Sequence, residues 1–85
     1  MKITISPTAK KHLLKLPLNI QKKTEKQFSL LTENYQHPSL RTRKMGGGDI
    51  FEGRIDIHYR FSFQVEGEDI YIFTIGPHDE GLGKK

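Results

Sequence analysis

The sequence contains no cysteine, and it has no long run of apolar residues. Without cysteine the chain can form neither a disulfide bond nor a thiolate metal site. No apolar stretch approaches the roughly 20 residues that a membrane-spanning helix needs. The N-terminal residues MKITISPTAKK also lack the apolar segment of a signal peptide. We therefore expect a soluble, cytoplasmic protein that does not contact a membrane.

The sequence also lacks the spacings that are typical of metal and cofactor sites. Its four histidines do not follow a metal-ligand spacing: His12, His37, His58 and His78. The three glycines at 46–48 do not form a phosphate-binding P-loop, because no Lys-Ser or Lys-Thr pair follows them. We therefore expect neither a metal nor a cofactor.

What the sequence does contain is a modest excess of positive charge. Its 85 residues include 14 Lys and Arg against 10 Asp and Glu, which gives a net charge of +4. A chain of this length is expected to form one domain, residues 1–85, with a small core. The positive charge is compatible with a nucleic acid or an acidic protein as partner.

The most informative stretch, DIFEGRIDIHYRFSFQ at residues 49–64, predicts two antiparallel strands joined by a short loop. Residues at alternate positions of a strand share a face, so the sequence predicts one buried and one polar face. The apolar face holds Phe51, Ile55, Tyr59, Phe61 and Phe63. The opposite face holds Glu52, Arg54, Arg60, Ser62 and Gln64.

The length of the loop decides how these strands pair. A two-residue loop at 57–58 would mix apolar and polar side chains on both faces, which a half-buried sheet does not tolerate. A three-residue loop over 56–58 keeps the faces apart and sets Arg54 opposite Arg60. Like charges directly opposite are unfavourable, so this pair needs a shared anion. That anion is either Glu52, which lies diagonal to Arg60, or a bound phosphate.

The segments before the hairpin predict one short strand and two helices. The strand covers Lys2 to Ile5, and Ser6-Pro7 suits the start of a helix, because serine caps and proline fits the first position. A second helix is predicted from about Leu18 to Asn34. Its buried stripe follows the helical period: Ile20, Thr24, Phe28, Leu31 and Tyr35.

The remaining segments complete a small sheet. Residues 38–44, PSLRTRK, predict a basic, extended connection in which Leu40 turns inward. The last strand, Ile70 to Ile75, is apolar at nearly every position and therefore belongs inside the sheet, between the hairpin and the N-terminal strand. We expect an α+β fold of order β-α-α-β-β-β. Two helices would pack on one face of a small, mainly antiparallel four-stranded sheet.

Four runs of the sequence carry a resemblance to a known family: HPSLRTRKM, DIFEGRID, YRFSFQVEG and IGPHDE. The most telling points are the Tyr59-Arg60 pair that opens the middle strand and the Ile75-Gly76 exit from the last one. Together with the order of elements, these runs resemble the RelE/ParE superfamily of toxins from bacterial type II toxin–antitoxin systems. The resemblance covers essentially the whole chain and implies the RelE-like fold.

The resemblance implies two main activities, of which we favour the first. The RelE-like branch comprises ribonucleases that cut mRNA on the ribosome without a metal, whereas the ParE-like branch poisons DNA gyrase and is not a nuclease. Each toxin is neutralised by a cognate antitoxin. An inactive homologue that only binds an antitoxin is a further alternative. Nucleases of this superfamily commonly end in a C-terminal helix, and residues 81–85 are too short and glycine-rich to form one.

The resemblance also implies a set of catalytic residues by position: Glu52, Arg54, Arg60 and His78. In metal-free RNA cleavage Glu52 would be the base for the ribose 2′-OH, and the two arginines would stabilise the charge on the phosphorane. His78 would be the acid for the leaving group. The expected products are a 2′,3′-cyclic phosphate and a 5′-OH. The basic connection supplies candidate RNA-binding residues: Arg41, Arg43 and Lys44.

Purely structural roles for the same residues stay open at this point. Glu52 would then only neutralise Arg54 and Arg60. His78 would pair with Asp79 or Glu80 on the surface.

Overall fold

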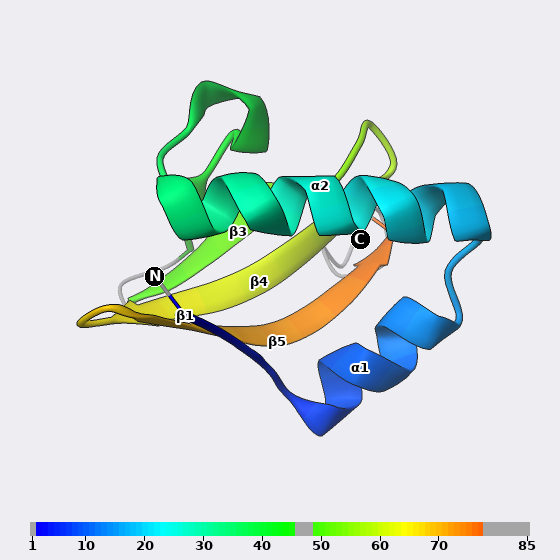
Figure 1. Ribbon diagram of the computed structural model, residues 1–85, viewed down its shortest axis with the longest axis horizontal. Coiled ribbons are helices and arrows are strands. Elements are labelled where there is room, and N and C mark those ends of the chain that lie inside the picture. The colour runs from blue at the N-terminus through cyan, green and yellow to red at the C-terminus, as the bar shows by residue number, and fades with distance from the viewer. Residues whose placement is uncertain (1, 46–48, 78–85) are drawn as a thin grey trace.

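The computed structural model describes residues 2–45 and 49–77, and it places two helices against one sheet (Figure 1). In chain order the elements are β1 (Lys2–Ile5), α1 (Pro7–Leu14), α2 (Leu18–Glu33), the 3-10 helix η1 (Pro38–Leu40), β2 (Arg43–Lys44), β3 (Ile50–Arg54), β4 (Tyr59–Glu66) and β5 (Asp69–Pro77). The predicted α+β class and the order of the main elements are confirmed.

The strands form one sheet in the order β1-β5-β4-β3-β2. β1 runs parallel to β5, and the other neighbouring pairs are antiparallel. As predicted, the last strand lies between the hairpin and the N-terminal strand. The sheet has five strands rather than the expected four, because Arg43 and Lys44 pair with Glu52 and Phe51 of β3. The connection over 38–44 is therefore not extended throughout, since it begins with the 3-10 helix η1 and ends in a short edge strand. Leu40 in η1 is fully buried, as predicted.

The β3–β4 hairpin has the predicted register. Phe51 pairs with Phe63, Gly53 with Phe61, and Arg54 with Arg60. The backbone N–H of Ile55 donates to the carbonyl oxygen of Tyr59 at 3.0 Å and closes the three-residue loop. The alternation of the sequence is thus preserved. Phe61 and Phe63 are completely buried, whereas the side chains of the opposite parity are partly exposed.

Helix α2 lies across one face of the sheet and covers the core (Figure 1). Its buried residues are Ile20, Thr24, Gln27 and Leu31, of which the helical period predicted all except Gln27. Phe28 meets Phe61 edge-on with ring centroids 5.1 Å apart. The Nε2 group of Gln27 donates to the carbonyl oxygens of Arg54 at 2.7 Å and of Ser39 at 3.2 Å. One buried amide therefore connects α2 with both β3 and η1.

Helix α1 continues along the edge of β5 where β1 ends (Figure 1). Ser6 caps this helix, as predicted. It also holds the helix to the sheet, because its N–H donates to the carbonyl oxygen of Ile72 at 3.0 Å and its Oγ to that of Phe73 at 2.9 Å. Further along, the N–H of Ile75 donates to Nδ1 of His12 at 3.2 Å. Side chains of α1 therefore satisfy backbone groups of β5 beyond the reach of β1.

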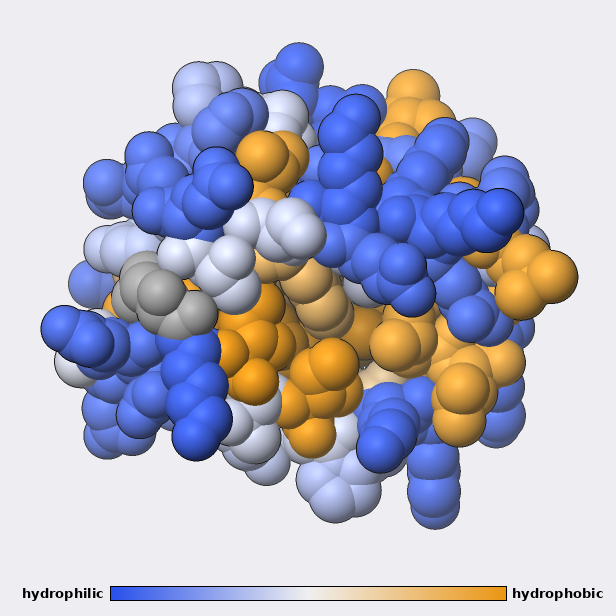
Figure 2. Space-filling view, in the orientation of Figure 1, coloured by the Kyte–Doolittle hydropathy of each residue, from blue (hydrophilic) through white to orange (hydrophobic). Residues whose placement is uncertain are grey.

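The molecular surface separates polar and apolar regions. Figure 2 shows hydrophilic side chains over α2 and apolar side chains in a band below it that extends toward the connection between α1 and α2. Two leucines at this connection are largely exposed, Leu14 at 69% and Leu18 at 74%. Within residues 2–45 and 49–77, neither helix has the length and apolar character that crossing a membrane requires.

Candidate functional site

The face of the sheet opposite α2 gathers the polar side chains that the alternation predicted. Arg54 of β3 lies opposite Arg60 of β4, and Glu52 lies opposite Ser62. β5 extends this face, since Ser62 pairs in turn with Thr74. The Ser62 and Thr74 hydroxyl oxygens lie 2.7 Å apart and share a hydrogen bond. The result is a row of charged and hydroxyl groups across three neighbouring strands.

Glu52 forms its ion pair with Arg43 and not with the facing arginines. The Oε1 atom of Glu52 lies 3.2 Å from Nε of Arg43, and its side chain is only 12% exposed. This contact exists because β2 places Arg43 directly opposite Glu52. Over the ranges 2–45 and 49–77, no carboxylate reaches ion-pair distance of Arg54 or Arg60. The sequence left two candidates for the anion between Arg54 and Arg60, namely Glu52 and a bound phosphate. Glu52 is already paired with another cation, Arg43.

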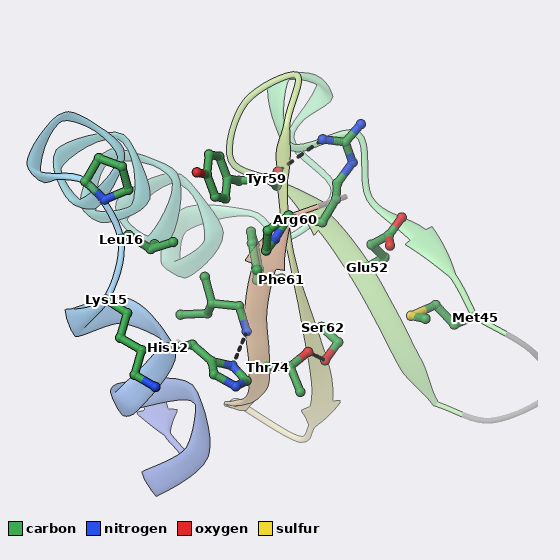
Figure 3. Close-up of a pocket in the computed structure, with 14 residues that line it drawn as sticks. His12, Lys15, Leu16, Met45, Glu52, Tyr59, Arg60, Phe61, Ser62 and Thr74 are labelled. Carbon is green, nitrogen blue, oxygen red and sulfur yellow. Dashed lines mark hydrogen bonds between the residues drawn. The ribbon is translucent and has the colours of Figure 1, made fainter. Parts of the chain in front are cut away.

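The guanidinium group of Arg60 folds back over the hairpin loop (Figure 3). Its Nη1 atom donates to the carbonyl oxygens of Asp56 and Tyr59. An arginine side chain carries five N–H donors. Among the described residues only those on Nη1 are engaged, so the donors on Nε and Nη2 remain for a ligand. The loop therefore fixes the orientation of Arg60 without consuming its capacity to bind an anion.

Positive charge accumulates at this end of the sheet. Burial lowers the pKa of the Arg60 guanidinium, and the nearby charges of Arg54 and Arg41 lower it further. Glu52 and Asp56 act in the opposite direction. Because the pKa of arginine starts far above neutral pH, Arg60 stays charged. An anion placed here would relieve the repulsion among the three arginines.

A groove of about 520 Å³ opens beside the polar face, where the end of β5 meets α1 (Figure 3). Its charged and polar lining consists of His12, Lys15, Glu52, Arg60, Ser62 and Thr74, and Leu16, Pro17 and Met45 add apolar surface. Of the four predicted catalytic residues, the groove brings together Glu52 and Arg60. Arg54 lies opposite Arg60 but is not among the described lining residues. His78 lies outside the described residues.

The predicted RNA-binding residues lie on the β2 side of the sheet, outside the lining of this groove. Arg41, Arg43 and Lys44 are all exposed. Arg41 ends η1 with a φ of +46°, a left-handed conformation that is uncommon for a residue other than glycine. Arg43 has a role that its position in the sequence did not predict, since it holds the carboxylate of Glu52.

Sequence reasoning missed the side of the groove that α1 forms. His12 and Lys15 precede the hairpin by about forty residues, and no local pattern connects them with Arg60. Thr74 was also missed, although its polar side chain in an otherwise apolar strand was a usable signal. A register shift between Ser62 and Phe63 places Thr74 opposite Ser62. Within the part of the chain that the structure describes, no three His, Asp or Glu side chains gather closely enough to hold a metal ion.

The fold is that of RelE-like toxins, as a comparison with solved structures shows. The YoeB/ParE toxin from Agrobacterium tumefaciens superposes with a TM-score of 0.79 at 13% identity, covering 92% of this chain and 99% of that one. The RelE–RelB complex from Pyrococcus horikoshii OT3 gives 0.79 at 20% identity, with coverages of 93% and 96%. The intact E. coli RelBE toxin–antitoxin complex gives 0.74 at 17% identity, with coverages of 88% and 93%.

A sequence comparison then gives the family. The model described as the ParE toxin of type II toxin–antitoxin systems, parDE, matches residues 3–82. The chain therefore belongs to this family of type II toxins. A search of curated protein sequences found no match.

Proposed function

We propose that this toxin is a metal-independent mRNA endonuclease that inhibits translation, acting on mRNA bound to the ribosome. The observation that carries the proposal is the pairing of Arg54 with Arg60 where, over the described residues, neither has a carboxylate partner. Two cations in this position stabilise an anion between them, and the charge that builds on a phosphorane is such an anion. The fold is similar to that of RelE and YoeB proteins, and members of these groups are ribonucleases.

The chemistry centres on Glu52 and Arg60, which line the groove, and on Arg54, which lies opposite Arg60. Glu52 takes the proton of the ribose 2′-OH, and the 2′-oxygen attacks the neighbouring phosphorus. The bond from phosphorus to the 5′-oxygen then breaks, leaving a 2′,3′-cyclic phosphate and a 5′-OH after the leaving oxygen is protonated. The ion pair with Arg43 fixes the orientation of Glu52, while Arg54 and Arg60 stabilise the phosphorane. The acid assigned to the leaving group is His78.

A second candidate is supported by the family match, whose description names parDE. In this alternative the protein binds DNA gyrase and does not cut RNA. The two candidates differ in the target, so one induction experiment separates them. We expect induction in cells to stop growth and fragment mRNA while plasmid supercoiling stays normal. Intact mRNA with loss of supercoiling would replace the nuclease by the gyrase inhibitor.

The residue-level test compares Arg54→Gln and Arg60→Ala with the control Lys26→Ala. Lys26 is an exposed lysine on α2, and its substitution removes the same charge. Removing one member of a transition-state clamp is expected to lower the cleavage rate by about 100-fold or more. Purified variants would be assayed on programmed ribosomes, with the new ends mapped. Because Arg54→Gln also removes like-charge repulsion, its unfolding free energy should not fall. Equal cleavage by Arg54→Gln and Lys26→Ala would refute the assignment.

We further propose that a cognate antitoxin binds this chain, in the cytoplasm where its mRNA target lies. The support is that relatives of the same fold were solved as complexes, among them the E. coli RelBE toxin–antitoxin complex. Leu14 and Leu18 offer exposed apolar surface to the amphipathic segment of such a partner.

A further inference from the structure

The groove has a second basic wall that the proposed chemistry does not use. His12 of α1 and Lys15, the residue that caps the C-terminal end of α1, line it on the side of β5 away from the arginines. Figure 3 shows His12 and Lys15 on one side, Ser62 and Thr74 in the middle, and Arg60 and Glu52 on the other side. Both walls of a single cavity therefore carry cations, with a hydroxyl pair between them.

The hydrogen bond from β5 determines what His12 can offer to a ligand. The N–H of Ile75 donates to Nδ1 of His12, so Nδ1 is the acceptor and the ring proton of the neutral imidazole is on Nε2. Within the described residues, the Nε2 group of His12 has no hydrogen-bond partner, although the residue lines the groove. It is therefore a hydrogen-bond donor held in place by the sheet edge.

Lys15 adds a full charge beside this donor. Its side chain is exposed, and over the ranges 2–45 and 49–77 it takes part in no ion pair. The only carboxylate among the described lining residues is Glu52, whose charge Arg43 already balances. The charged part of the lining is thus complementary to an anionic occupant. The aromatic ring of Tyr59, which also lines the groove, suits the face of a base.

We propose that the groove binds single-stranded RNA across β5, with His12 and Lys15 holding a phosphate next to the one between Arg54 and Arg60. That the bound nucleic acid is RNA rests on the proposed function. It makes Lys15 and His12 binding residues with no part in the bond-breaking step. A contact to the scissile phosphate and a second contact to its neighbour would together align the ribose with Glu52.

The test measures binding of a short 2′-O-methyl RNA, which lacks the attacking hydroxyl and is not cut, by fluorescence anisotropy over a range of salt concentrations. We expect Lys15→Gln to weaken binding roughly threefold to tenfold and to reduce the salt slope by about 0.7, the value for one lost phosphate contact on a single strand. The matched control is Lys11→Gln, an exposed lysine of the same helix that does not line the groove. Equal losses for Lys11→Gln and Lys15→Gln would mean unspecific charge attraction and would overturn the proposal.

Two further arms keep the proposal independent of folding and of catalysis. His12→Gln should weaken RNA binding by a similar factor, and a urea titration of the same variant reports any loss of stability from the unpaired Ile75 N–H.

A poly-glutamate peptide of equal charge should compete poorly, and a Lys15-dependent preference for this peptide over RNA would contradict the assignment. Lys15-dependent RNA binding without any cleavage activity would refute the nuclease alone. Cleavage that is insensitive to both substitutions would refute this second phosphate site alone.

Discussion

Gly53 faces Phe61 across the hairpin, and the aromatic ring lies directly over the glycine. A β carbon at position 53 would overlap Cζ of Phe61 and lie 2.8 Å from its Cε1. Aromatic rings often cover a glycine on the neighbouring strand, because the missing side chain leaves room for them. The absence of a side chain at one position is thus what lets Phe61 become 1% exposed.

Gly53→Ala is therefore expected to lower the free energy of unfolding by about 1–3 kcal/mol, the usual cost of overpacking a core. Urea denaturation of the purified variant measures this. Gly76→Ala is the control, because an added β carbon there has no atom of the described residues within 4 Å. The expected change is below about 0.5 kcal/mol. If both variants lost the same stability, the contact with Phe61 would not be the constraint.

The two facing arginines show a different kind of residue-scale constraint. Their repulsion opposes folding, and the hairpin nevertheless sets them opposite each other because its apolar residues must share one face. The free energy gained by burying Phe61 and Phe63 exceeds the cost of the repulsion. A site that is ready to bind an anion is the consequence.

At the scale of elements, the β3–β4 loop depends on one carboxylate. Oδ1 of Asp56 accepts hydrogen bonds from the backbone N–H groups of His58 at 2.8 Å and Tyr59 at 3.0 Å, and Oδ2 lies 3.5 Å from Nζ of Lys23. Burial acts to raise the pKa of Asp56, but the two backbone donors and Lys23 together hold it below the ordinary value of 3.8. The folded state therefore favours the ionised form.

The sign of the pH dependence follows from this direction. A carboxylate with a lowered pKa in the folded state stabilises the protein above its unfolded pKa, and this stabilisation is lost as the pH falls through the folded pKa. Asp56→Asn is expected to be about 1 kcal/mol less stable than the unmodified chain at pH 7. The difference should shrink as the pH falls below 3.8, the ordinary value for this carboxyl.

Thermal or urea unfolding at several pH values between 7 and 2 measures this difference. Lys23→Gln serves as the comparison, because the lysine side chain is 54% exposed and an ion pair of this kind contributes only a few tenths of a kcal/mol. A gap between Asp56→Asn and the unmodified chain that stayed constant down to pH 2 would show that the charge of Asp56 has no part in stabilising the loop.

At the scale of the whole molecule, the exposed leucines border the groove on its α1 side, because residues 15–17 between them line it. Leu14 and Leu18 mark the connection between the helices, whereas Ile57, 63% exposed, lies in the hairpin loop near the arginines. An antitoxin segment has two available surfaces, one on the helices and one on the sheet face. Antitoxin binding at one surface or at the other would respond oppositely to Leu18→Glu and Ile57→Glu.

We expect Leu18→Glu to weaken antitoxin binding by about tenfold or more, as for a central apolar contact of an interface. Position 18 is the first residue of α2, where a negative charge interacts favourably with the helix dipole, so the fold should remain as stable. Ile57→Glu introduces the same charge in the loop and should leave the affinity unchanged. Titration calorimetry with the purified antitoxin gives both values. A loss confined to Ile57→Glu would move the antitoxin to the sheet face.

The local pattern of the chain was enough to predict the two helices, the four longer strands and the central register, but not η1 or β2. Strand alternation with a three-residue loop paired Arg54 with Arg60, because a two-residue loop would have mixed apolar and polar side chains on both faces. The Ser6-Pro7 start of α1 and the helical period of α2 were predicted for the same reason, since caps and periodicity act over a few residues. The continuous apolar run of β5 placed that strand inside the sheet.

The tertiary structure alone decided which distant groups meet. Arg43 reaches Glu52 because a two-residue edge strand forms, and Gln27 is buried because two backbone carbonyls from other elements converge on it. His12 and Ile75 are 63 positions apart, and their hydrogen bond follows from α1 running along the free edge of β5. Sequence periodicity carries no information on such contacts, since they depend on strand order and on the packing of α1. The arginine pair was therefore predictable from the sequence, whereas the groove beside it was not.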